Sequence, residues 1–438
     1  MKICLFADAG SVHIQQLAPG LAARGHDVHI VTHKPTEVPG ATVERFCVPG
    51  PSLTNPRRWE GRRVNYLRGF LRRFDVVNIH FLHDWGFHFR ASNRTPSASA
   101  GPTSEPQAPA RGLGRSLALP VLLEALRPPM IENACLIASP WGSDIVDPPG
   151  ETPATPALTR TRVTLLRGAD AVTTCGRTFA RVVADYAGIA PGNVDVLPFG
   201  VDLDTFKTIR AATVRERADP YRVGFFKGFR EVYGPTYLIQ AIPFVLAQIP
   251  NTRFELVGDG AQLSRCQGMA SDLGVSSSID WIPRQPHREL PKLIARWDVT
   301  VIPSVQEAFG VAALESSAME VPVVASDVGG LRDTVRDGQT GLLVPPRCPE
   351  AIADALIMIL QDADLRRRMG LAGRERVQSD YDWRDLHDRW IKFYEQARAG
   401  VAQPPSAGPS RGRLGHRAQR RAAVPQNPEP ESLAAAEH

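Results

Sequence analysis

The sequence has no apolar run long enough to cross a membrane and no cysteine pattern typical of a metal site. Nowhere do about 18 apolar residues follow one another, as a membrane-spanning helix requires. The six cysteines are scattered, and none has the C-x-x-C spacing of a zinc site. The opening residues, MKICLFADAG, become polar too soon for a secretory signal. These absences predict a protein of the reducing cytoplasm, without a disulfide framework or a metal site.

A G-x-G-x-x-G fingerprint is also missing, which argues against a dehydrogenase. The 438 residues suffice for two domains with a core each, and 43% hydrophobic and 22% charged residues are ordinary for a globular protein. The net charge of +5 is modest, and arginine gathers in residues 57–73. This segment suits the surface of an anionic membrane, or a helix with a solvated polar face. Nucleic-acid binding is not expected, because no recognition module accompanies the arginines.

Strand-like apolar runs alternate with helical patterns along the whole chain. This alternation predicts an α/β fold with two doubly wound parallel-sheet (Rossmann-like) domains. The expected strands of the first half are residues 2–7, 28–32, 76–80, 136–139, 171–174 and 194–198. Those of the second half are residues 223–226, 253–257, 279–282, 299–302, 321–325 and 341–344. Expected helices include residues 12–24, 237–246, 289–296, 349–360 and 383–399.

Two segments break this alternation. Residues 91–114 and 401–438 are rich in Ser, Pro, Ala, Gly or Arg and have no apolar period. Such segments bury too little surface to offset the entropy of ordering, so we expect a disordered insertion and a disordered tail. The predicted domains are residues 1–203, which contain the insertion, and residues 204–380, followed by a terminal helix at residues 381–400.

The segment 304–346 contains the strongest sign of chemistry. Glu307 and Glu315 are eight positions apart, and Phe309, Gly310 and Val311 between them predict a helix start. A helix start offers free N–H groups to an anion, and a carboxylate binds a pair of vicinal hydroxyls. Helical geometry separates the two glutamates by roughly 12 Å. The segment is therefore predicted to hold a ligand with a sugar, a diphosphate and a ribose in a row.

This spacing resembles the E-x7-E signature of the retaining glycosyltransferases of family 4, which have the GT-B fold. The resemblance is strong in the second half and weak in the first. It implies that Glu307 contacts the donor sugar and that Glu315 holds the ribose hydroxyls. It also implies that the amides of Phe309, Gly310 and Val311 help to bind the sugar or the phosphates. Two further segments match, LVGDG at residues 256–260, which includes Gly258, and LPFGVD at residues 197–202, where phenylalanine replaces the usual asparagine.

The departing diphosphate needs fixed cations, because its charge is stabilised by Arg or Lys. In the segment VGFFKGFREVYG at residues 223–234, Lys227 occupies the first cationic position of the family. The second position is Val232, which is not basic. Arg230 could supply the second charge from a shifted place, or could be an ordinary surface charge.

The first half offers weaker candidates. Gly10 follows the first strand and could approach the donor. Asp144 lies in WGSD at residues 141–144, which resembles the "HGSD" turn of the family, and it either positions a substrate hydroxyl or caps a helix. His80 begins HFLHD at residues 80–84, whose spacing fits no zinc pattern, so we expect at most a polar wall of a cleft.

By this resemblance, the first domain binds the acceptor, the second binds the nucleotide-sugar, and the terminal helix returns to the first domain. The expected reaction transfers a sugar with retention from a UDP- or GDP-sugar to a hydroxyl of a glycan, a lipid or a small molecule. No cofactor and no metal are expected. The expected location is the cytoplasm, with contact to the inner face of an anionic membrane as an open alternative. A sugar-nucleotide epimerase and a non-catalytic nucleotide-sugar-binding protein remain the other hypotheses.

Overall fold

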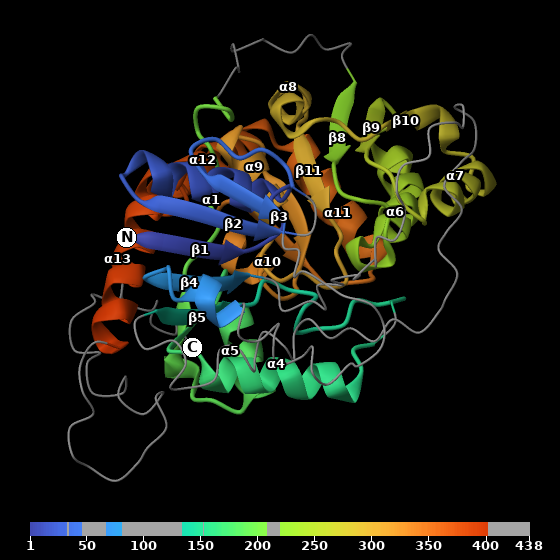
Figure 1. The fold of residues 1–438 in the computed structure, drawn as a ribbon. Helices are drawn as coiled ribbons and strands as arrows, with labels where there is room; N and C mark the ends of the chain where they lie inside the picture. The colour runs from blue at the N-terminus through green and yellow to red at the C-terminus, as the bar shows by residue number, and fades with distance from the viewer. Residues whose placement is uncertain (33–34, 46–66, 81–133, 152, 208–219, 402–438) are drawn as a thin grey trace, which may run out of the picture.

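The computed structural model describes residues 1–32, 35–45, 67–80, 134–151, 153–207 and 220–401. Two parallel sheets dominate it (Figure 1). The predicted insertion, the predicted tail, Cys47 and most of the arginine-rich segment lie outside the described residues, so these expectations stay predictions.

The first sheet has the strand order β3-β2-β1-β4-β5-β6-β7, and all of its pairings are parallel. From β1 the chain adds β2 and β3 on one side of the sheet, and it then crosses to add β4 on the other side of β1. The direction of winding therefore reverses between β1 and β4. Its strands are β1 (Lys2–Phe6), β2 (Asp27–Thr32), β3 (Thr42–Arg45), β4 (Val76–His80), β5 (Cys135–Ser139), β6 (Ala171–Thr174) and β7 (Val194–Val196).

The second sheet repeats this pattern with the order β10-β9-β8-β11-β12-β13, again all parallel. Here the order reverses between β8 and β11. Its strands are β8 (Tyr221–Phe225), β9 (Thr252–Val257), β10 (Ile279–Ile282), β11 (Val299–Ile302), β12 (Val323–Ser326) and β13 (Gly341–Val344). Ligands of doubly wound sheets bind outside the carboxyl ends of the strands at such reversal points.

Helices cover both sheets, as burial on two faces requires of parallel strands. All five residues of β4 and of β5 are buried, so their near-continuous apolar sequence needs no alternation. Among the described residues, the helices of the first unit include α1 (Val12–Ala23), α4 (Pro156–Gly168) and α5 (Arg177–Ala187). Those of the second are α6 (Pro235–Gln248), α7 (Leu263–Asp272), α8 (Leu290–Ile294), α9 (Val311–Ala318), α10 (Leu331–Thr334), α11 (Pro349–Gln361) and α12 (Ala363–Asp380).

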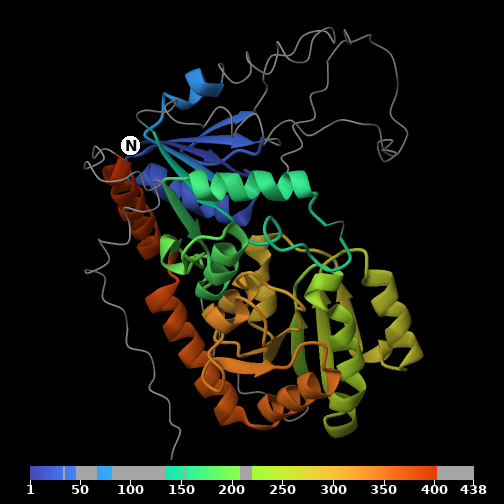
Figure 2. The same ribbon diagram turned by 90° about the horizontal axis from the view of Figure 1, so that it is seen from below.

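The terminal helix α13 (Trp383–Val401) packs against α1 and β5 of the first unit, although α12, which directly precedes it in the chain, belongs to the second unit. Figure 2 shows α12 and α13 running one after the other along one side of the molecule, from the second unit to the first. Asn78 in β4 donates to the hydroxyl of Tyr394 in α13 over 2.9 Å, and both groups are buried. This buried hydrogen bond fixes the helix on the sheet, because breaking it would leave two buried polar groups without a partner.

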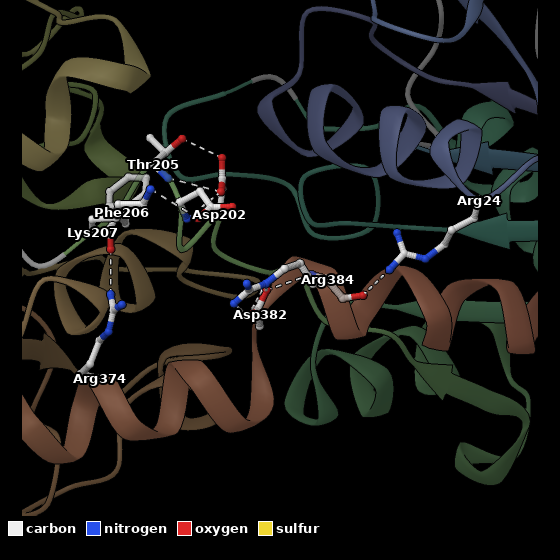
Figure 3. Close-up of polar contacts among 9 residues, drawn as sticks. Arg24, Asp202, Thr205, Phe206, Lys207, Arg374, Asp382 and Arg384 are labelled. Atoms are coloured by element: carbon white, nitrogen blue, oxygen red, sulfur yellow. Dashed lines mark hydrogen bonds and ion pairs between the residues drawn. The ribbon is translucent and has the colours of Figure 1, made fainter.

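Polar contacts also fix the connection between the units (Figure 3). The backbone of Val201 pairs with the chain at Asp382, just before α13 begins. Arg374 of α12 donates to the carbonyl oxygen of Phe206 over 2.7 Å. On the other side of the crossing, Arg24 of α1 donates to the carbonyl oxygen of Arg384 over 2.8 Å. The two segments that connect the units, around Val201 and around Asp382, are therefore held to each other and to both units.

Candidate active site

A cleft with a volume of about 560 Å³ lies between the two units. Its walls come from residues that follow the carboxyl ends of strands, among them Val12 and His13 after β1 and Trp141 after β5. On the opposite side, Lys227 follows β8 and Glu307 follows β11. The reversal point of the second sheet, between β8 and β11, therefore opens into this cleft, where the topology places a ligand.

Lys227 and Glu307 form an ion pair in the cleft, with Nζ of Lys227 donating to Oε2 of Glu307. The side chains are 13% and 14% exposed. Nζ of Lys227 also lies 4.4 Å from the ring centroid of Tyr233. Burial by itself lowers the pKa of Lys227, but the charge of Glu307, Tyr233 and the hydrogen bond to Glu307 outweigh it and raise that pKa. Lys227 is thus a fixed cation at neutral pH.

The start of helix α9 forms the wall beside this pair. Gly310 caps the helix with φ of 97°, a conformation that L side chains rarely adopt, and Gly310 and Val311 line the cleft. Phe309 is buried and packs edge-on against Phe199 of the other unit, with centroids 5.6 Å apart. A helix start facing a cleft presents free N–H groups to an anion.

The turn Val328-Gly329-Gly330 packs directly against the loop that carries Glu307. A Cβ on Gly329 would lie 2.0 Å from the carbonyl oxygen of Glu307, and φ of Gly329 is 44°. The amide of Gly330 donates to that same oxygen over 2.9 Å. The glycine pair is needed here because it lets the turn hold Glu307 in place at close range.

In the middle of α9, Glu315 pairs with His287. Nε2 of His287 lies 2.6 Å from Oε1 of Glu315, and both residues line the cleft. Burial lowers the pKa of His287, but the hydrogen bond and charge of Glu315 and the charge of Asp202 outweigh it and raise that pKa. Glu307 and Glu315 therefore lie in one cavity, each already held by a basic partner.

Arg230 lines the cleft as well, but its guanidinium pairs with Glu151 of the first unit. Both side chains are nearly half exposed, so the pair contributes little to stability. The contact nevertheless spans the cleft. A second contact of this kind joins the units nearby, where Asp333 of α10 accepts from the amide and the hydroxyl of Thr178 over 2.9 Å and 3.2 Å.

The wall on the first unit is aromatic. His13 stacks on Phe199 with ring centroids 3.7 Å apart and an interplanar angle of 6°, and it meets the edge of Trp141. His80 lies behind Trp141, fully buried, with both ring nitrogens unpartnered within the described residues. Burial, together with a neighbouring histidine, lowers the pKa values of His13 and His80 to about 3, so both rings are neutral at neutral pH.

Three expected site residues do not line the cleft. Asp144 is fully buried, and its Oδ1 accepts from the amides of Trp141 and Gly142 over 3.1 Å and 2.7 Å, so it holds the turn that lines the cleft. Gly10 donates to Asp8 on the surface side of the first turn. Gly258 has φ of 146° and packs against the carbonyl oxygen of Lys227, where a Cβ would come within 2.4 Å.

Sequence reasoning did not single out His13, Tyr233 or His287. His13 and His287 lie in segments without a recognisable motif, and they reach the cleft only because distant elements meet. Tyr233 lies in the segment 223–234, directly after Val232, and its ring faces Lys227.

Within the residues that the structure describes, no cluster of His, Cys, Asp and Glu could hold a metal ion. The expected HFLHD cluster extends beyond them at residues 81–84. None of the described helices combines the length and the apolar character needed to span a bilayer.

Comparison with known proteins agrees with this architecture. The pattern of the family described as "Glycosyl transferases group 1" matches residues 207–376, and that of "Glycosyltransferase Family 4" matches residues 10–99. A glycogen synthase of Mycobacterium tuberculosis is 29% identical over 240 residues, which are 55% of this chain and 57% of that protein. A D-inositol 3-phosphate glycosyltransferase of Nocardia farcinica is 32% identical over 241 residues, 51% of this chain and 53% of the relative. The chain thus matches little more than half the length of these curated relatives.

Solved structures share the whole fold. Sucrose-phosphate synthase from Thermosynechococcus elongatus superposes with a TM-score of 0.70 at 22% identity, covering 91% of this chain and 99% of the other. Anabaena HepE in complex with UDP-glucose superposes with a TM-score of 0.67 at 18% identity, covering 90% of this chain and 100% of the other. With its two parallel-sheet units, its interdomain cleft and both family patterns, the chain belongs to the group 1 glycosyltransferases of family 4, with the GT-B fold.

Proposed function

We propose that the protein transfers a sugar, with retention of its anomeric configuration, from a nucleoside diphosphate sugar to an acceptor hydroxyl. The observation that carries this proposal is the meeting of Lys227, Glu307 and Glu315 in one cleft around the start of α9. A cation, a helix start and two carboxylates are the groups that a diphosphate flanked by two polyols requires.

The donor would lie along α9, with its diphosphate at the helix start and its ribose at Glu315. One oxygen of Glu315 is held by His287, which leaves the other to accept from the ribose hydroxyls. We propose a UDP- or GDP-sugar as donor and no resident cofactor. Two curated relatives are named a glycogen synthase and a D-inositol 3-phosphate glycosyltransferase, and the structural neighbour HepE was solved in complex with UDP-glucose.

Lys227 would change partner when the donor binds. In the empty cleft its Nζ is paired with Glu307. A diphosphate at the start of α9 offers Lys227 a stronger anion, and this exchange frees Glu307 to accept from a hydroxyl of the donor sugar. Binding of the diphosphate thereby prepares the residue that positions the sugar.

The reaction breaks the bond between the anomeric carbon and the diphosphate oxygen and forms a bond between that carbon and the acceptor oxygen. The acceptor proton leaves with the nucleoside diphosphate. Lys227 stabilises the negative charge that grows on the departing diphosphate, as fixed cations do for such leaving groups. The aromatic wall of the first unit excludes water and so favours transfer over hydrolysis.

The acceptor would bind on the side of the first unit and be a glycan, a lipid or a small molecule. Action in the cytoplasm, with contact to the inner face of an anionic membrane through the arginine-rich segment, belongs to the same proposal and awaits its own test. A vesicle sedimentation assay with the full chain and the double charge reversal Arg62→Glu/Arg63→Glu would provide that test.

The function is tested by incubating the full chain with UDP-, GDP- and ADP-sugars and measuring release of the nucleoside diphosphate. The anomeric configuration of the product is then read by NMR. We expect release from one nucleotide class and a product with the configuration of the donor. Glu307→Ala should lower turnover at least about tenfold with an intact fold, because it removes a contact to the reacting sugar. Release from none of the donors, or an inverted product, would contradict the proposal.

A further inference from the structure

The first unit's side of the cleft has no charged side chain within the described residues. Its lining consists of aliphatic, aromatic and small polar groups: Val12, His13, Trp141, Ser143, Phe179 and Val182 are its main members. Val12 and Val182 are 39% and 37% exposed and lie on the same wall of the cleft. Apolar groups left open at the wall of a substrate cleft mark a surface that a ligand covers.

His13 is the polar centre of this wall. Its ring is locked between Phe199 and Trp141, and its nitrogens have no hydrogen-bond partner within the described residues. The charged and titratable groups that face it are His287 across the cleft and the neutral His80 behind Trp141. A neutral imidazole offers one donor and one acceptor, which matches a hydroxyl. It lacks the positive charge that a phosphate needs.

Among the described residues, the basic groups that line the cleft, apart from the neutral His13, belong to the second unit, and each is already paired. Lys227 faces Glu307, Arg230 faces Glu151, and the imidazole of His287 faces Glu315. Under the proposed function, the donor diphosphate binds Lys227. A second phosphate, on the acceptor, would find no unpaired cation on the described walls, and its desolvation would go uncompensated.

We propose that the acceptor is an uncharged hydroxyl compound with an apolar or aromatic face, held through one hydroxyl by His13, and that phosphorylated sugars are rejected. This inference rests on the proposed function, since it concerns the second substrate of the same cleft. It separates the chain from the relative in Nocardia farcinica, whose name specifies an inositol phosphate.

The experiment uses the full chain with the donor that shows release without acceptor. Phenyl β-glucoside and glucose are compared with glucose 6-phosphate and inositol 3-phosphate, and the readout is the increase in nucleoside diphosphate release. We expect at least a tenfold larger increase with phenyl β-glucoside than with either phosphorylated compound. An equal or larger increase with a phosphorylated compound would overturn the inference, as would no response to both neutral compounds while donor turnover is intact. Failure of donor turnover itself would instead contradict the proposed function.

Two kinds of variant sharpen the test. Val182→Lys places a cation on the wall and should shift the preference toward glucose 6-phosphate at least fivefold. The matched control is Leu273→Lys, which changes an apolar side chain of similar exposure, 43%, outside the cleft lining and should leave the preference unchanged. His13→Ala should raise the acceptor KM by about tenfold more than the donor KM. His13→Gln should raise the acceptor KM less than His13→Ala does. Equal effects on both KM values would refute the role of His13.

Discussion

Replacing Lys227 by methionine would remove the positive charge beside the start of α9 while keeping the length of the side chain. Lys227 and Glu307 are both mostly buried, at 13% and 14% exposure, and their charges face each other. Loss of one partner leaves the other as an uncompensated charge in a nearly dry site. The substitution therefore perturbs both stability and catalysis, and the two effects have different causes.

The loss of stability arises because the carboxylate of Glu307 no longer has an ion-pair partner. Breaking a buried ion pair in this way costs about 3 kcal/mol of unfolding free energy. For units of this size, that corresponds to a fall of roughly 6–12 °C in melting temperature. The catalytic effect follows from the missing cation at the leaving diphosphate. Removal of one preorganised charge-stabilising group lowers turnover by about 10²–10³.

The double variant Lys227→Met/Glu307→Gln separates the two effects. Both charges are then absent, so no lone charge remains and we expect most of the lost melting temperature to return. Turnover should stay low, because neither substitution restores a cation. Glu307→Gln alone completes the cycle and gives the coupling free energy of the pair.

Melting temperature is measured by scanning calorimetry, and turnover by release of the nucleoside diphosphate from the active donor. Lys227→Arg is the matched control, since it keeps the charge in a side chain of similar length. The reasoning is refuted if the double variant regains turnover together with stability, because Lys227 would then serve only to neutralise Glu307.

Three further predictions concern other contacts of the fold and the cleft. His287→Gln should lower the melting temperature most below pH 6.5 and progressively less as pH rises through the raised pKa of His287, because only protonated His287 pairs fully with Glu315; a pH-independent difference would contradict this. Gly329→Ala should cost more than about 2 kcal/mol and reduce donor binding in titration calorimetry, since its Cβ meets Glu307; wild-type values would speak against the close packing. Asn78→Ala should cost about 1–3 kcal/mol in chemical denaturation, because two buried hydroxyls lose their partner; an unchanged midpoint would argue against that contact.

Much of the fold was predictable because local patterns specify it. Five expected strands, at residues 76–80, 171–174, 279–282, 299–302 and 341–344, agree with the structure to the residue. The strand expected at residues 321–325 begins later, at Val323, because Pro322 has no N–H to donate to the ladder. The edge strand β3 escaped prediction because its sequence, TVER, contains a single apolar residue. Helix α7 also escaped, because its sequence, LSRCQGMASD, has few apolar positions.

For the site, the sequence by itself identified four of the groups that the second unit supplies. Glu307, Gly310 and Glu315 lie in one short segment after a predictable strand, and Lys227 follows another predictable strand at the position where the family it resembles has a cation. Their placement in one cleft then follows from a property of parallel sheets, since the carboxyl ends of all strands meet at one edge.

The tertiary structure alone decided how these groups are partnered. Helix α13 returns across the molecule, and the two units meet so that Arg230 finds Glu151 and His13 faces the cleft from the first unit. The uncharged wall around His13 and the hydrogen bond between His287 and Glu315 combine side chains from distant segments of the chain. No local pattern encodes such contacts, because they arise from the packing of whole units and from the burial that this packing imposes.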